Sequence, residues 1–296
     1  MKRKDLVIGS IIIGSFVLFL GFLFLAFLGI FSEDRSASLD FGEKVAIIEV
    51  HGVISNSANV IRQLKKYGED SSIPALVIHI DSPGGGVAAS QEIYEEINKL
   101  RKKGKKIVAS MGSLGASGGY YIACAADTIV ANSGTITGSI GVIFEFPVIE
   151  ELMKKIGVKV EVVKSGEMKD VGSFSRPMTE KERKHIQDVI NDTYDQFVNV
   201  LVKERNLPKE EVIRLADGRV FTGRQAKELR LIDELGDLED AIDIAGKMAG
   251  IKGRPKTIKE KVRRVSIWDV VLDGLNKVDL INNTEILLPK LQYLYK

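Results

Sequence analysis

Short apolar runs alternate along the chain with longer amphipathic stretches. Runs of about four to eight residues rich in Val and Ile have the pattern of buried strands, and apolar residues three and four positions apart are typical of helices that cover a sheet. Strands are predicted at residues 45–50, 75–80, 106–110, 128–131 and 159–163. Helices are predicted at residues 59–67, 88–102, 121–126, 148–156, 180–204, 209–215, 223–229 and 239–248.

The order of the first five elements is strand, helix, strand, helix, strand. This order predicts an α/β domain with a largely parallel sheet and helical crossovers. Sites in such sheets lie beyond the carboxyl ends of the strands. Two glycine-rich stretches, residues 84–86 and 112–119, each follow a predicted strand and precede a helix, so we expect both to face one cleft.

An uncharged apolar run of 26 residues extends from Leu6 to Phe31. As a helix it would be about 39 Å long, enough to cross a hydrocarbon core of about 30 Å. A cleaved signal peptide is the alternative, but its apolar region is shorter. Three basic residues precede the run, so the N-terminus is predicted to be cytoplasmic and the rest extracytoplasmic, at the cell membrane. The predicted organisation is an anchor (1–31), a linker (32–43), a catalytic domain (44–250) and a C-terminal extension (251–296).

Composition and charge exclude several kinds of partner and site. The 296 residues carry a formal net charge of +2, which gives no reason to expect nucleic acid as a partner. The single cysteine, Cys124, cannot form an intrachain disulfide, and its apolar neighbours predict a buried helix residue. The three histidines, His51, His79 and His185, are scattered and do not form a metal motif, so no metal cofactor is expected.

Ser117 is the strongest candidate nucleophile. It lies among small residues just before a predicted helix, where glycines permit a tight turn and the helix N-terminus favours negative charge on oxygen. A simple N-cap is the alternative role for this serine. Residues 84–86 lack the spacing of a nucleotide-binding loop, so no nucleotide is expected, and their N–H groups are better suited to an oxyanion hole.

The base that would activate Ser117 is not evident from local sequence. A triad with His79 and Asp81 is disfavoured, because strand alternation places both on one face of a strand where they could not readily stack. A lysine is the known substitute, but its pKa of about 10.4 must be lowered by burial. Local sequence does not choose among the lysines.

Four motifs in order resemble the signal peptide peptidase A (protease IV) family of serine–lysine membrane peptidases. They are DSPGGG (81–86), GASGGYY (115–121), TGSIGV (137–142) and KSGEMKD (164–170), and GRVFTG (218–223) is a further similar stretch. The resemblance covers roughly residues 45–250. It implies an α/β fold of the ClpP/crotonase type, built from repeated β-β-α units and here preceded by one transmembrane helix.

The resemblance also implies roles for particular residues. Ser117 matches the nucleophile, Lys169 the general base, and Ser139 a serine that orients the lysine amine. The oxyanion donors implied are the backbone N–H groups of Gly85 and Gly118, although the motif does not settle which glycine of the triple serves. Because Glu167 and Asp170 would raise the pKa of Lys169, we expect their carboxylates to point away from its amine.

The expected activity is therefore that of a membrane-anchored serine endopeptidase that acts through an acyl-enzyme. The family implies peptide substrates, above all remnant signal peptides, the lipid bilayer as a partner through the anchor, and a ring-like homo-oligomer in which Ser117 and Lys169 can meet across a subunit boundary. The alternatives are a protease of the type that partners stomatin-like proteins, a crotonase-like acyl-CoA enzyme, or a non-catalytic scaffold.

Overall fold

The computed structural model describes residues 14–21, 24, 43–260 and 292–294. The chain divides into two compact units, residues 1–42 and 43–296. Most of the predicted membrane span lies outside the described residues, although 14–21 and 24 are helical. No helix in the described part of the chain is long and apolar enough to cross a bilayer. The anchor therefore stays a prediction.

The second unit contains one eight-stranded sheet in the order β7-β6-β4-β2-β1-β9, in which β5 also pairs with β4, and β8 pairs with β5. All of its strand pairs are parallel except β6 with β7. Its strands are β1 (Lys44–His51), β2 (Ala75–Ser82), β4 (Lys106–Ala116), β5 (Thr128–Ala131), β6 (Ile136–Gly138), β7 (Val220–Thr222), β8 (Glu234–Leu235) and β9 (Lys256–Lys259). A separate two-stranded sheet pairs β3 (Gly84–Gly86) with β10 (Gln292–Leu294).

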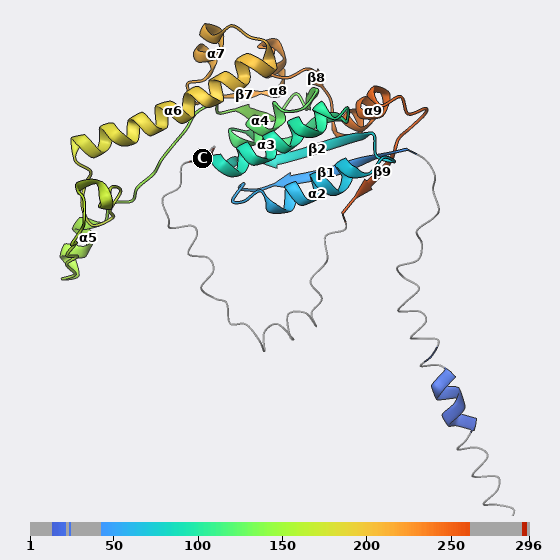
Figure 1. Cartoon of the computed structure of the whole chain (residues 1–296), viewed down its shortest axis with the longest axis horizontal. Coiled ribbons are helices and arrows are strands. Elements are labelled where there is room, and N and C mark those ends of the chain that lie inside the picture. Colours follow the sequence, from blue (N-terminus) through green and yellow to red (C-terminus); the bar gives the residue numbers. More distant parts are fainter. Residues whose placement is uncertain (1–13, 22–23, 25–42, 261–291, 295–296) are drawn as a thin grey trace, which may run out of the picture. The chain divides into compact units, whose positions relative to one another are not determined.

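Helices cover both faces of the sheet (Figure 1). The strand period of two divides the core, since Ile48 and Ile78 belong to one apolar cluster and Ile47 and Val77 to the other. The helices are α2 (Ala58–Glu69), α3 (Val87–Lys102), α4 (Gly118–Ala123), α5 (Glu150–Lys155), α6 (Glu180–Arg205), α7 (Lys209–Leu215), α8 (Gly223–Glu228) and α9 (Leu238–Met248), with a 3₁₀ turn at Glu167–Asp170. Cys124 is buried, as predicted.

The glycine-rich stretches differ from the prediction. The third predicted strand was expected to end at residue 110, but β4 continues to Ala116 and pairs with β6 near its end. Gly84–Gly86 forms a short strand instead of a turn, and α4 begins at Gly118 rather than at 121. The prediction was wrong at these points because neighbouring strands supply hydrogen bonds that local sequence does not reveal.

Residues 144–178, which we call the arm, lie at the far end of α6 from α7 (Figure 1). The strand predicted at 159–163 is absent, because these residues pair with no other strand of the described chain to form a ladder. The arm also carries exposed apolar side chains, which include Val148, Ile149, Leu152, Ile156, Val160, Val162 and Val163.

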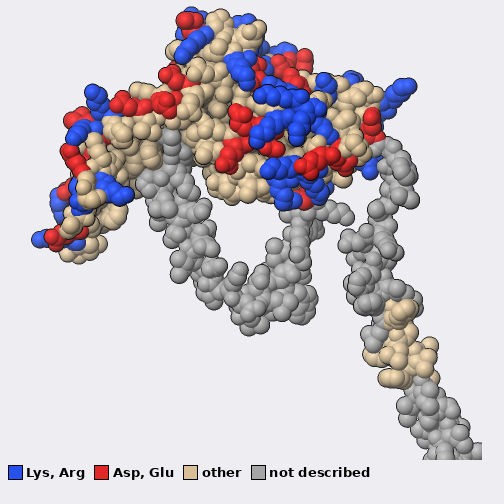
Figure 2. All heavy atoms as spheres, viewed as in Figure 1, with Lys and Arg blue, Asp and Glu red and all other residues tan. Residues whose placement is uncertain are grey.

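The charged side chains on the face shown in Figure 2 do not form a surface of one sign. Basic side chains gather over the region of α2 and α3, and acidic ones border them. This mixed surface agrees with the nearly balanced charge of the sequence, which has 42 basic and 40 acidic residues.

Candidate active site

Ser117 stands between the end of β4 and the start of α4. Its φ of 52° is positive, a conformation that few residues other than glycine adopt and that stores strain at a sharp strand-to-helix turn. The main chain is held on both sides, since its N–H donates to Gly138 O at 2.8 Å and its carbonyl accepts from Tyr121 N–H at 2.8 Å. These two hydrogen bonds fix the main chain of Ser117, and the hydroxyl takes no part in them.

The Ser117 hydroxyl is buried but unpaired. The residue is 1% exposed, and its Oγ is the one buried side-chain polar atom in the described part of the chain without a hydrogen-bond partner. A buried unpaired hydroxyl costs about 1–3 kcal/mol, so such an atom calls for an explanation. A catalytic role would explain the unpaired Ser117 Oγ, because a nucleophile's hydrogen bonds are made with a base and with the substrate.

Gly118 lies directly against the triple glycine. A Cβ added to Gly118 would lie 3.2 Å from Gly85 N, and a Cβ added to Gly84 would lie 2.6 Å from Gly118 N. Because Gly118 is the first residue of α4, the helix offers its N–H no carbonyl acceptor. The two glycine-rich stretches that the sequence placed in one cleft are thus in contact.

Hydrogen bonds to the surrounding body distinguish the three glycines. Gly84 N–H donates to Ser82 Oγ at 3.1 Å, and Gly86 N–H donates to Ile54 O at 2.8 Å. Ile54 N–H in turn donates to Gly84 O at 2.8 Å. Since alternate residues of a strand direct their N–H groups to opposite edges, Gly85 N–H faces the edge away from Ile54. Neither Ile54, which acts through its backbone, nor Ser82, which acts through its hydroxyl, was singled out from the sequence.

Ser139 is brought close to Ser117 by strand pairing. Gly138, the residue before it, pairs with Ala116 at the end of β4. Ser139 is 7% exposed, has a positive φ of 50° and donates its N–H to Arg219 O at 2.8 Å. The structure therefore places both predicted serines at adjacent strand ends.

His79 is a packed residue of β2. Its Nδ1 lies 3.4 Å from Ser110 Oγ, and its ring meets that of His51 edge-on with centroids 5.8 Å apart. Burial lowers the pKa of His79, which favours the neutral ring. Because Ser117 Oγ has no partner, His79 is not its base in this structure. The described residues also contain no cluster of three or more His, Cys, Asp or Glu that could hold a metal.

Lys169 lies in the 3₁₀ turn of the arm and is exposed. Its amine makes no hydrogen bond or ion pair with any described residue, and it is not a partner of Ser117 Oγ. The chain therefore does not by itself bring Lys169 and Ser117 together, although it brings Ser117, Ser139, Gly85 and Gly118 together.

The two acidic neighbours of Lys169 are paired with other cations. Glu167 binds Lys181 at 2.5 Å, and Asp170 binds Lys164 at 2.5 Å and Arg176 at 2.8 Å. Arg176 and Lys164 hold the pKa of Asp170 well below its usual range. The carboxylates are thus engaged away from the Lys169 amine, as the sequence led us to expect.

Strand β10 occupies the free edge of the triple glycine. It runs antiparallel to β3, with Tyr293 opposite Gly85. The Tyr293 carbonyl oxygen would lie 2.1 Å from a Cβ added to Gly84, and Gly118 N borders the same point. A peptide carbonyl of the chain itself therefore lies beside the amide groups that frame Ser117.

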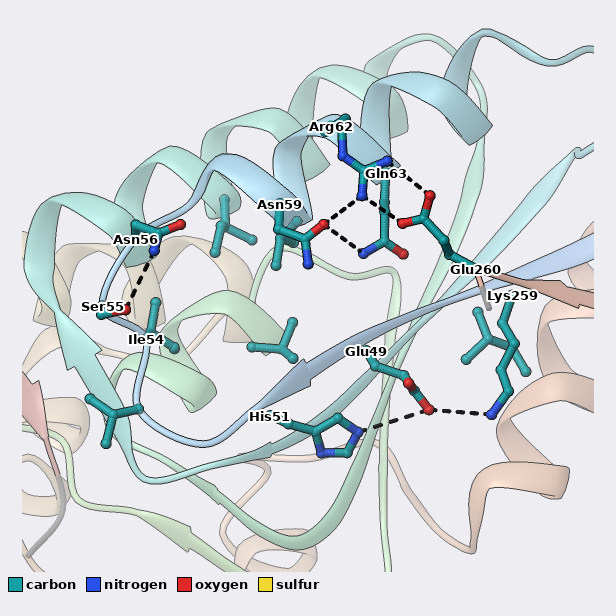
Figure 3. A pocket seen from close by; sticks show the side chains of 15 residues that line it. Glu49, His51, Ile54, Ser55, Asn56, Asn59, Arg62, Gln63, Lys259 and Glu260 are labelled. Carbon is teal, nitrogen blue, oxygen red and sulfur yellow. Dashed lines mark hydrogen bonds and ion pairs between the residues drawn. The ribbon is translucent and has the colours of Figure 1, made fainter. Parts of the chain in front are cut away.

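A cavity of about 630 Å³ is lined by Ile54 together with residues of β1, α2 and β9 (Figure 3). Its charged side chains pair with one another: Arg62 with Glu260 at 2.6 Å, and Glu49 with Lys259 at 3.5 Å. Ser117 and Lys169 do not line it. The cavity is thus distinct from the site built around Ser117, although Ile54 both lines it and binds the triple glycine.

The fold and this site define a serine peptidase with a Clp-type α/β domain. Residues 99–252 match the family model described as Peptidase family S49, and residues 42–133 match the model described as Clp protease. The chain belongs to peptidase family S49, which confirms the resemblance drawn from the motifs.

Named relatives agree with this family. The "Putative protease slr0021" of Synechocystis sp. is 48% identical over 211 residues, which cover 71% of this chain and 76% of that protein. Protease 4 of Haemophilus influenzae is 38% identical over 221 residues, 72% of this chain but 36% of its own length. Serine protease SPPA, chloroplastic, of Arabidopsis thaliana is 34% identical over 248 residues, 79% of this chain and 36% of that protein.

Proposed function

We propose that this chain is a membrane-anchored endopeptidase in which Lys169 activates Ser117. The neutral lysine amine takes the proton from Ser117 Oγ as that oxygen bonds to the peptide carbonyl carbon. The carbon–nitrogen bond then breaks, the leaving amine takes the proton, and water hydrolyses the acyl-enzyme. Ser139 orients the lysine amine. The observation that carries the proposal is the buried, unpaired Ser117 hydroxyl at a strained turn.

Gly85 and Gly118 are the proposed oxyanion donors. Gly84 and Gly86 already donate to Ser82 and Ile54, so Gly85 is the member of the triple whose N–H faces the substrate edge. Gly118 N–H belongs to the first turn of α4, where donors are unpaired. The sequence left the choice within the triple open, and these hydrogen bonds favour Gly85.

Lys169 is proposed to reach Ser117 of a neighbouring copy in a ring-like homo-oligomer. Its amine is exposed and without a partner among the described residues, while the Ser117 hydroxyl is buried and without a base. The exposed apolar side chains of the arm, such as Val160 and Val162, are suited to burial against a second copy. A lysine buried in that contact would have the lowered pKa that a base requires.

Mixed assemblies test the dyad. Full-length Ser117→Ala and Lys169→Ala chains should each lose peptide cleavage by about a thousandfold or more. Co-assembled in equal amounts, they should regain about a quarter of wild-type activity, because a site with both residues intact can then form between different copies. Lys159→Ala, which changes another exposed lysine of the arm, is the matched control and should stay active.

Two results would contradict this mechanism. Full activity of Lys169→Ala would remove that lysine as the base. Failure of co-assembled variants to regain activity, with mixing shown by differently tagged chains, would place the dyad within one chain. An alkaline rise in kcat/KM that disappears in Lys169→Ala would report the titration of the amine.

The proposed substrates are remnant signal peptides, with the body on the extracytoplasmic side of the membrane. The apolar run Leu6–Phe31 supports this, since an anchor would hold the site beside the bilayer in which such peptides remain. Deletion of residues 1–31 should release the protein from the membrane fraction. A variant that stays membrane-bound without them would contradict the anchor.

A further inference from the structure

Ser82 carries a buried hydroxyl at the point where several segments of the site meet. It is the last residue of β2 and is 0% exposed. In the sheet it pairs with Gly115, near the end of β4. A Cβ added to Gly119 of α4 would lie 3.1 Å from Ser82 O. Ser82 therefore lies beside the strand that leads into Ser117 and the helix that follows it.

The Ser82 hydroxyl links two hydrogen bonds. It donates to Gly52 O at 2.6 Å and accepts from Gly84 N–H at 3.1 Å. Gly52 is itself held in place, because its N–H donates to Asp81 O at 3.0 Å. A serine hydroxyl has one proton and two lone pairs, so a proton directed at Gly52 leaves a lone pair for Gly84. The direction of the Gly84 N–H bond is thereby fixed.

The direction of the Gly84 N–H bond matters because Gly84 precedes the proposed oxyanion donor. The carbonyl of Gly84 and the N–H of Gly85 belong to one planar peptide group, so they turn together. Ile54 N–H donates to that carbonyl at 2.8 Å, and Ser82 Oγ holds the peptide group before it. Gly84 has a positive φ of 98° and no side chain to restrict rotation between the two groups. The Ser82 and Ile54 hydrogen bonds therefore set the direction of Gly85 N–H.

We propose that Ser82 is a positioning residue of this peptidase, whose hydroxyl directs the Gly85 N–H toward the carbonyl oxygen of the substrate. This inference rests on the proposed function of Ser117 and Gly85. Ser82 acts through Gly84 and not on the substrate itself. Negative charge on the substrate oxygen develops in the transition state, so a misdirected donor should slow the chemical step more than it weakens binding.

Ser82→Ala in the full-length chain tests this role. The change leaves the Gly84 N–H without its acceptor. For a peptide selected from a library for cleavage by the wild-type chain, kcat should fall about thirtyfold and KM should change less than about twofold. The loss is smaller than the hundredfold or more that follows removal of an oxyanion donor, because Ile54 still holds the Gly84 carbonyl.

Ser82→Cys keeps a weaker donor and acceptor in the same place. Its kcat should lie between those of the wild type and Ser82→Ala, about tenfold below the wild type. If Ser82→Ala does not fold, Ser82→Cys carries the same comparison of kcat with KM.

Ser110→Ala is the matched control. Ser110 is 2% exposed, lies in the neighbouring strand β4, and has its Oγ 3.4 Å from His79 Nδ1. The change removes a buried serine hydroxyl that makes no hydrogen bond to the triple glycine. Ser110→Ala should therefore lower the thermal midpoint as Ser82→Ala does, while its kcat stays within about twofold of the wild type.

A transition-state analogue separates a misdirected donor from a general loss of structure. With a peptide aldehyde, Ser117 Oγ bonds to the aldehyde carbon, the carbon–oxygen double bond becomes single, and the serine proton passes to the base, which leaves an oxyanion. Ser82→Ala should weaken inhibition by the aldehyde about thirtyfold, in parallel with kcat. Inhibition by the corresponding peptide alcohol, which has no carbonyl to attack, should change less than about twofold.

Three results would overturn the positioning role: an unchanged kcat in folded Ser82→Ala, equal losses of kcat in Ser82→Ala and Ser110→Ala, or equal weakening of the aldehyde and the alcohol. Failure of the proposed function has a different signature. In that case the wild-type chain itself would cleave no peptide of the library, and a serine-directed probe would not acylate Ser117.

Discussion

The body around Ser117 and the arm around Lys169 differ in how far contacts within the chain hold the candidate site residues in place. In the body, Ser117, Ser139 and the glycines are fixed by strand pairs and main-chain hydrogen bonds. In the arm, the predicted base is exposed, and residues 159–163 form no strand. The body thus fixes the proposed nucleophile and the proposed amide donors, and the arm carries the proposed base, which has no partner among the described residues.

This difference shows how a proposed nucleophile and its proposed base can be kept apart within one chain. A nucleophile without its base is inert, so a chain that holds them apart would be inactive until it assembles. In the proposed ring, assembly brings the two together and buries the apolar side chains of the arm at the same time. The following predictions compare the effects of changes in the body with the effects of changes in the arm.

The largest effect is expected from Gly84→Ala in the body. An added Cβ would meet two backbone atoms, Tyr293 O at 2.1 Å and Gly118 N at 2.6 Å, at a positive φ of 98°. The displaced amide should cost about a hundredfold in kcat/KM. Gly104→Ala is the matched control, because its φ of 92° imposes similar strain with nothing within 4 Å. Equal activity of the two variants would show that the glycine contact is not needed.

The next effect is expected from Arg176→Met in the arm. The Arg176 guanidinium binds Asp170 and Glu182, and so fastens the arm to the first turn of α6. Its loss should speed proteolysis within the arm about tenfold, and kcat/KM should fall with it. The thermal midpoint of the body should change little. Arg254→Met, which removes an exposed arginine paired with Glu239, is the control and should leave the arm unchanged.

A pH effect is expected at the start of α6, where Arg176 of the arm binds Glu182. Arg176 lowers the pKa of Glu182 to about 2 from an ordinary 4.5. A lowered folded-state pKa means that this stabilisation is complete above about pH 4.5 and is lost as the pH falls toward 2. Hydrogen exchange near Glu182, corrected for intrinsic rates, should accelerate severalfold over that window. If Arg176→Met showed the same acceleration, the ion pair would not be its cause.

The smallest effect is expected from the removal of two equivalent helix N-caps, one beside the arm and one in the body. Thr179 caps α6 beside the arm and Thr222 caps α8 in the body, each within a complete capping box. Replacement by alanine should cost about 0.5–1 kcal/mol at each site. Thr222→Ala should lower the global free energy of unfolding measured with denaturant. Thr179→Ala should mainly accelerate local exchange at the start of α6, and an equal global loss in both would mean that the arm unfolds together with the body.

The sequence by itself indicated the first alternating strands and helices, the candidate nucleophile Ser117 and the family. These features depend on local spacing: the strand and helix periods are visible over a few residues, and the motifs around Ser117 and Gly85 are contiguous. The sequence also predicted correctly that the acidic neighbours of Lys169 would be engaged elsewhere, since a base cannot tolerate them nearby.

Only the tertiary structure showed that Gly84 N–H binds Ser82 and Gly86 N–H binds Ile54, so that Gly85 N–H faces the edge paired with β10. It alone placed Tyr293 against Tyr121 and Phe197, residues far apart in the chain. It also showed that Lys169 is not beside Ser117 within one chain. The physical reason is common to all three: these contacts join segments distant in sequence, and no local pattern records which distant segment will come to lie beside another.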